Sequence, residues 1–201
     1  MRPVLSYVLI AVVAGLVGAS FSKAPDLADK FSQHFGSQPS DPEGFWTTPA
    51  IDGYGKIHYE SDAAYKPASG DSNKVVFQIT KAENGPTVPN LGLERVARVV
   101  NLYIAAGVPQ DKLKFVVSVT GDGTPAMLTN AQYKKFYGVD NPNLKLINEL
   151  RAKGVDVSVC DQSVAFHHFN HDWIDTSVTH ALSSPTTVAT LENQGYAFLA
   201  M

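Results

Sequence analysis

The stretch that decides the fold is Gly154-Val155-Asp156-Val157-Ser158-Val159-Cys160-Asp161-Gln162-Ser163. Valines alternate with Asp156, Ser158 and Cys160, and an alternation of this kind predicts a β-strand over residues 155–160. The valines point to one face of the sheet, and the other three side chains point to the opposite face. A helix is expected to begin directly after Cys160. The stretch therefore predicts a strand–helix unit with a thiol at its junction.

Strand and helix patterns alternate through the rest of the C-terminal two thirds. Apolar runs predict further strands at residues 75–79, 114–120, 177–181 and 196–201. Helical spacing, caps and closing glycines predict helices at 91–106, 131–137, 142–153 and 185–194. Such alternation is typical of a parallel sheet with helices on both faces. We expect an α/β fold, a three-layer α/β/α sandwich around a five-stranded, mainly parallel sheet.

Three local details complete this interpretation. Asn141 and Ser184 are the expected N-caps of the last two helices, because each precedes a proline suited to the first helical position. In the helix at 91–106, the apolar stripe places Asn101 on the face away from the core. Residues 121–125 are expected to form a flexible loop.

The carboxyl ends of parallel strands meet at one edge of a sheet, where ligands bind in open α/β folds. That edge would hold Thr80 and Lys81, the loop with Thr120, Gly121, Asp122 and Gly123, and Cys160 with its followers Asp161 and Gln162. The loop could offer backbone N–H groups to an anion, or be a plain turn. It lacks the third glycine of a dinucleotide-binding fingerprint.

Cys160 is the only cysteine of the 201 residues, so it has no partner for an internal disulfide. Three explanations stay open for this thiol. It fills space as a small apolar side chain, it reacts as a nucleophile, or it forms a disulfide between subunits.

Three histidines, His167, His168 and His171, lie within five residues. If this segment is helical, His167 and His171 stand one turn apart and could chelate a metal, with Asp172 or Cys160 completing the set. His167 and His168 could instead act as proton donors near the thiol. Since no second motif with ligand spacing accompanies them, we favour a solvated or interface turn and expect no metal or other cofactor.

Residues 1–19 have the pattern of a secretory signal peptide, with a positive start, an apolar run and small residues before Ser20. Cleavage after residue 24 is a second choice, and an uncleaved membrane anchor is the competing interpretation. We expect an exported, periplasmic protein with no membrane contact after cleavage. The net charge of -3 and the absence of a long basic run argue against nucleic acid as a partner.

Residues 25–73 are rich in Pro, Gly, Asp and Ser, with scattered aromatic side chains such as Phe45 and Trp46. The prolines interrupt any long helix or strand, so the segment is expected to be an extended N-terminal arm. It either covers its own domain, residues 74–201, or wraps a neighbouring subunit.

The domain resembles the DsrE/DsrF-like proteins, which share the YchN-type fold. The residues that carry the resemblance are Lys74-Val75-Val76-Phe77, 138–144, the stretch quoted first, and Asn193-Gln194-Gly195-Tyr196-Ala197. The Cys-x-Gln-Ser sequence after a valine-rich strand is the most specific of them.

The resemblance implies a five-stranded parallel sheet, assembly into homo-trimers or hexamers, and a role in sulfur relay. Cys160 would accept a sulfur atom as a persulfide from a donor protein or a small sulfur compound and pass it to an acceptor. Many members have a histidine at the end of the second strand, where this chain has Thr120. The alternative is a non-catalytic protein that binds a small ligand or metal, or serves in assembly, with Cys160 merely packed.

Overall fold

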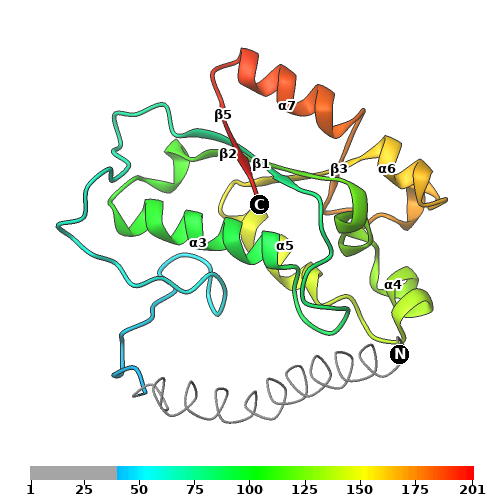
Figure 1. The fold of residues 1–201 in the computed structure, drawn as a ribbon, viewed down its shortest axis with the longest axis horizontal. Coiled ribbons are helices and arrows are strands. Elements are labelled where there is room, and N and C mark those ends of the chain that lie inside the picture. Colours follow the sequence, from blue (N-terminus) through cyan, green and yellow to red (C-terminus); the bar gives the residue numbers. More distant parts are fainter. Residues whose placement is uncertain (1–39) are drawn as a thin grey trace, which may run out of the picture. The chain divides into compact units, whose positions relative to one another are not determined.

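One sheet of five strands, in the order β4-β3-β2-β1-β5, organises the chain (Figure 1). All four strand pairs are parallel, as the sequence predicted. The strands are β1 Lys74–Ile79, β2 Lys114–Val119, β3 Asp156–Cys160, β4 Thr179–Ala181 and β5 Ala197–Ala200. The structure, a computed structural model, describes residues 40–201, so the predicted signal peptide and the first part of the arm lie outside the described residues.

Helices cover both faces of this sheet and give the three expected layers. On one face lie α3 Leu91–Ala105 and α5 Asn143–Ala152, which also contact each other. On the other lies α7 Ser184–Asn193, against β1 and β2 (Figure 1). The remaining helices are α4 Asn130–Tyr137, α6 Asp161–Phe166 and the short 3-10 segments η1 Gln110–Lys112, η2 Gly121–Met127 and η3 His171–Trp173. None of the helices within residues 40–201 is long and apolar enough to span a membrane.

The two faces of the sheet are packed differently. Toward α3 and α5, strands β1, β2 and β3 present buried apolar side chains, and Phe115 packs edge-on against Phe77 and Tyr103. Toward α7 the contact is polar: Ser184 Oγ accepts from Gln78 Nε2 at 2.8 Å and from Ser118 Oγ at 2.9 Å. Ser184 is the only buried residue of α7. Hydrogen bonds to Ser184 therefore contribute directly to holding this helix on the sheet.

The described part of the arm lies on its own domain. Thr47 and Ile57 form an isolated antiparallel bridge, and Ile51 and Ile57 are buried. The Asn101 side chain of α3 accepts the backbone N–H groups of residues 50 and 51 and donates to two arm carbonyls. The expectation that Asn101 points away from the core was wrong, because the arm covers that face of α3 and buries it.

Two further local predictions need correction. The N-cap of α7 is Ser183, whose Oγ accepts from Thr186 N at 3.1 Å, whereas Ser184 is the first helical residue. Residues 121–125 belong to η2 rather than to a flexible loop. The cap expected at Asn141 is present, since its Oδ1 accepts from Asn143 N at 3.0 Å, although the regular helix begins one residue later than predicted.

Candidate functional site

Cys160 is the last residue of β3 and pairs with Ala181 of β4. Its side chain is on the α7 side of the sheet, two residues after Ser158. The thiol is free but only 3% of the residue is exposed. Ser158 is buried as well and donates to Val117 O at 2.8 Å. This strand face is therefore not exposed to solvent, although it carries polar residues. The thiol lies at the predicted edge of the sheet but is buried there.

The segment after β2 forms the 3-10 helix η2 and uses backbone groups within the fold. Gly121 has φ of 56°, and a Cβ there would lie 3.0 Å from Thr80 O. Gly123 is buried, and its N–H donates to Thr120 O at 3.2 Å. The Thr120 N–H in turn donates to Ile79 O, while Asp122 is exposed. Two of the backbone donors expected to face a ligand are thus used within the fold.

His167 connects this segment to the helix after Cys160. Its Nε2 lies 2.9 Å from Gly121 O, and because a carbonyl only accepts, Nε2 carries the proton in this contact. The ring stacks on Phe169 with centroids 5.3 Å apart. A second link joins Thr124 Oγ1 and Ser163 Oγ at 2.7 Å, both buried. His167 therefore links the two segments at the β3 edge through this hydrogen bond.

His168 and Gln162 lie at the surface of the same region. His168 is exposed and has φ of 56°, just after the six-residue α6 ends at Phe166. The helix that would have placed His167 and His171 one turn apart therefore does not continue. Gln162 Nε2 donates to Leu182 O at 3.2 Å and ties α6 to the turn that follows β4.

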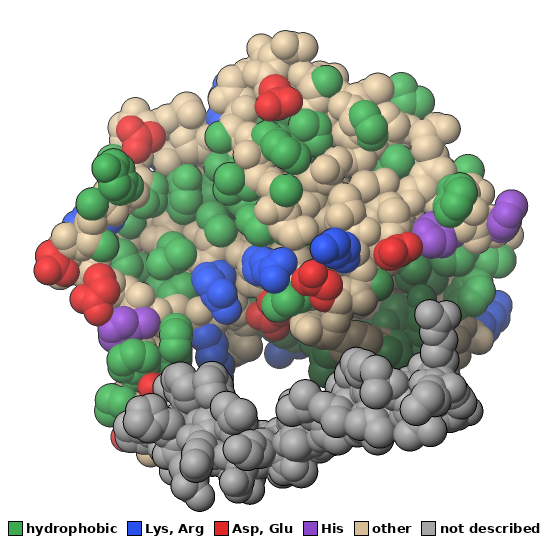
Figure 2. Space-filling view, viewed as in Figure 1, with side chains coloured by type: hydrophobic (Ala, Val, Ile, Leu, Met, Phe, Trp, Pro, Cys, Tyr) green, Lys and Arg blue, Asp and Glu red, His purple; other side chains and the backbone are tan. Residues whose placement is uncertain are grey.

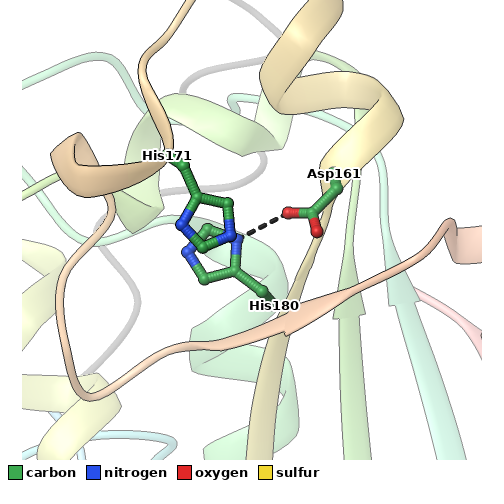
Figure 3. Close-up of side chains that lie close together, drawn as sticks. All are labelled: Asp161, His171 and His180. Atoms are coloured by element: carbon green, nitrogen blue, oxygen red, sulfur yellow. Dashed lines mark hydrogen bonds and ion pairs between the residues drawn. The ribbon is translucent and has the colours of Figure 1, made fainter.

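His171 instead meets a histidine that sequence analysis missed. Its ring stacks on His180 of β4, with centroids 3.3 Å apart and 13° between the planes (Figure 3). His180 Nδ1 lies 2.5 Å from Asp161 Oδ1, at the start of α6. His180 lies in the predicted fourth strand, so applying the strand-end rule to that strand as well would have found it. The structure brings Asp161, His171 and His180 together and leaves His167 apart from them.

A separate hollow of about 200 Å³ lies beyond β1. It is lined by the segment 82–90, by Pro125 and Ala126, and by Tyr133 and Tyr137 of α4. Tyr133 OH donates to Pro86 O at 3.1 Å, and burial raises the pKa of both phenols above the usual 10.0. These tyrosines stay neutral donors at physiological pH. None of them was singled out in the sequence.

Charged side chains are mixed rather than segregated on the face seen in Figure 2. Lys and Arg side chains lie among Asp and Glu side chains there, without one continuous basic surface. The described ion pairs that carry a Lys or Arg are surface pairs such as Arg151–Asp156 and Lys134–Asp140. Their contribution to stability is small, in the range typical of exposed pairs.

Comparison with known proteins found a family model and solved structures that are similar to this chain. The model of the DsrE/DsrF-like family matches residues 64–201, well over half of the chain. A solved structure of a protein of unknown function, MTH1491 from Methanobacterium thermoautotrophicum, is similar with 16% identity and a TM-score of 0.47. The match covers 63% of this chain and 97% of that one. A search of curated proteins found none that matches.

Proposed function

The chain belongs to the DsrE/DsrF-like family, and we propose on this basis that it is a sulfur carrier that holds a persulfide on Cys160. The observation that carries the proposal is the place of the only cysteine. Cys160 ends β3 at the carboxyl edge of a parallel sheet, directly before α6, and this edge is where α/β folds bind ligands.

The proposed step is an exchange at a sulfane sulfur. The Cys160 thiolate attacks the outer sulfur of a donor persulfide, a new S–S bond forms at Sγ, and the donor's own S–S bond breaks. The donor leaves as a thiolate with the bonding electron pair, so no outside oxidant or reductant is needed. An acceptor thiolate then removes the sulfur by the same exchange and regenerates Cys160.

Burial of Cys160 sets a condition on this chemistry. Sulfur transfer requires contact between the two sulfur atoms, so residues that cover Cys160 must move for a donor to reach Sγ. The turn between β4 and α7 adjoins Cys160, because Cys160 pairs with Ala181 at the end of β4. That turn includes Leu182, whose carbonyl accepts from Gln162 and whose side chain is 72% exposed. His167 and the segment starting at Gly121 would keep the other side of the edge in place during this movement.

The test is mass spectrometry of the whole protein after incubation with a low-molecular-weight persulfide or thiosulfate. We expect a gain of one sulfur atom that maps to Cys160, is removed by a thiol reductant and is absent in Cys160→Ser. A thiol count on the unfolded protein confirms that Cys160 was reduced at the start. A reduced Cys160 that gains no sulfur from either donor would refute the carrier function.

Burial also favours a second candidate, a binding or assembly protein in which Cys160 only fills space. Buried cysteines behave as small apolar side chains. Under this alternative, a thiol reagent modifies the native protein only at the rate of unfolding, and Cys160→Ala lowers stability without changing any transfer. A modification rate well above the unfolding rate would exclude it. A third possibility is a disulfide between the Cys160 residues of two subunits, which would appear as a dimer on non-reducing gels. It also requires that Sγ become exposed.

Assembly and location belong to the same proposal. We propose a homo-oligomer, a trimer or hexamer, located in the periplasm. Support for assembly comes from family membership and from large exposed apolar side chains, such as Phe166 and Leu182 near the Cys160 edge and Phe198 and Leu199 on β5. Support for export comes from the sequence of residues 1–19. Light scattering on the purified protein and fractionation of cells test the two points separately.

A further inference from the structure

We propose that Asp161, His171 and His180 bind a divalent transition-metal ion, with Zn²⁺ as the best match. This inference goes beyond sulfur transfer and does not depend on it. The three ligand atoms, one from each residue, lie within 4.8 Å of one another. Figure 3 shows the two imidazoles side by side, with the carboxylate directed at the nitrogen of His180.

The spacing of the three side chains suits one ion. In a tetrahedral zinc site with bonds of about 2.1 Å, neighbouring ligand atoms lie about 3.4 Å apart. The ligand atoms of Asp161, His171 and His180 lie within 4.8 Å of one another, so they need to approach by little more than about 1 Å to reach this separation. The two ring planes are only 13° apart, so their in-plane lone pairs do not yet converge, and at least one imidazole must turn about its side-chain bonds to share an ion with the other ring and the Asp161 oxygen.

The donor types favour the same class of ion. Two imidazole nitrogens and one carboxylate oxygen suit zinc and related first-row metals better than the hard ions Ca²⁺ and Mg²⁺, which prefer oxygen ligands alone. Binding a metal keeps both rings neutral and gives the carboxylate a cationic partner.

The surroundings allow a metal to enter. A hollow of about 380 Å³ adjoins the cluster and is lined by both histidines, by Asp172 and by Asp175. These two carboxylates add negative charge that attracts a cation. The Asp175 Oδ1 already accepts a hydrogen bond from Ser177. Asp172 is exposed in η3 and directly follows His171, so its carboxylate is the better candidate for a further oxygen ligand to the ion. With three protein ligands, one position stays open to water or another ligand.

The ligands come from three elements that meet at the proposed sulfur-transfer edge. Asp161 starts α6, His171 starts η3, and His180 lies in β4. A bound ion would therefore fasten these elements together beside Cys160. The thiol itself is not among the grouped residues, so coordination is expected through nitrogen and oxygen only.

The experiment is a zinc titration of the full protein against a chromophoric chelator, together with Co²⁺ absorption spectra. We expect one ion per chain, a four- or five-coordinate cobalt spectrum without a thiolate charge-transfer band, and the same result in Cys160→Ser. His171→Ala is the decisive variant because His171 is exposed and its loss leaves the core intact. It should weaken binding by at least about tenfold, as should His180→Ala.

His168→Asn is the matched control. It removes a neighbouring exposed imidazole that is not in the cluster, and asparagine tolerates the positive φ of this position. Binding should be unchanged. The melting temperature provides a readout independent of the chelator, since zinc should raise it in the parent and not in His171→Ala. No zinc binding by the parent, or equal binding by the parent and His171→Ala, would overturn the metal site and leave the sulfur carrier proposal untouched.

Discussion

Asn101 Oδ1 accepts the backbone N–H of Ile51 at 2.9 Å, and this bond ties the arm to α3. The same oxygen accepts from Ala50 N, and Nδ2 donates to the carbonyls of Tyr54 and Gly55, both at 2.9 Å. One buried amide thus satisfies four backbone groups of a segment with little secondary structure of its own. The arm is an integral part of the domain at this point.

Asn101→Ala is therefore expected to lower the free energy of unfolding by about 2–4 kcal/mol, because buried backbone donors and acceptors lose their partners. Urea denaturation measures the loss, and limited proteolysis should show faster cleavage within residues 43–59. Asn148→Ala, an exposed asparagine on α5, is the control and should change stability little. Equal effects of the two substitutions would contradict the importance of the Asn101 contacts.

Gly55 offers a sharper test of arm docking. A Cβ at this position would lie 2.2 Å from Arg98 N, a backbone atom of α3 that cannot move aside, and φ is +58°. Gly55→Ala should therefore displace the arm and expose Ile51 and Ile57. Gly53→Ala is the matched control, since it has φ of +77° with nothing within 4 Å and should cost only about 1–2 kcal/mol of backbone strain. Hydrogen exchange of the Ile51 amide reports docking directly and should accelerate in the first variant alone.

Ser184 should behave as the hydrogen-bonding anchor of α7. Ser184→Ala removes the partner of both Gln78 and Ser118, and we expect a loss of about 1–3 kcal/mol. The double variant Ser118→Ala with Ser184→Ala should be less destabilised than the sum of the single changes, because their shared bond is lost only once. Chemical denaturation of the four proteins gives the coupling. Strict additivity would show that the two hydroxyls do not interact.

Alkaline pH should destabilise the fold through Tyr133. Burial, with a smaller contribution from Tyr137, raises the pKa of this phenol above its ordinary 10.0. The folded state therefore favours the protonated, neutral form. The stability that Tyr133 contributes is fully present below pH 10.0, where the phenol is protonated in both states. Above pH 10.0 the unfolded state binds fewer protons than the folded state, so this contribution is lost as pH rises through the higher pKa of the folded state.

The measurement is the free energy of unfolding from neutral pH to above pH 10.0, with phenolate absorbance followed in the folded protein. Tyr133→Phe should reduce the alkaline slope, and it should also lose the hydrogen bond to Pro86 O. Tyr65→Phe removes a fully exposed phenol and serves as the control. If the free energy of unfolding falls with pH as steeply in Tyr133→Phe as in the parent protein, Tyr133 is not the group that causes the alkaline sensitivity.

The sequence predicted the strands and helices because their signals are local. Valine alternation before Cys160 and the caps around Pro142 depend on neighbours a few residues away. Asn101 and Ser184 were misassigned because their partners lie far along the chain, in the arm and in β1 and β2. A polar residue on a helix normally indicates solvent, and only the tertiary structure shows that another segment covers it.

The sequence predicted only the part of the candidate site that follows from local patterns and strand order. The strand-end rule placed Cys160, Asp161 and the segment from Thr120 near one another, and it follows from topology alone. The histidines at 167–171 are close in sequence, but the partner of His171 is His180, which lies in the three-residue strand β4. No local sequence pattern predicts this stack. The burial of the thiol depends on tertiary packing, which no local pattern encodes.

The clamp at Asn101 also has a consequence for the order of folding. Residues 50 and 51 precede the side chain that binds them by 51 and 50 positions, so they leave the ribosome well before α3 exists. β1 likewise waits for both of its neighbours, since β2 and β5 both follow it in the sequence. The nascent arm therefore lacks these hydrogen bonds until α3 has been synthesised, and it stays accessible to chaperones and proteases during that interval.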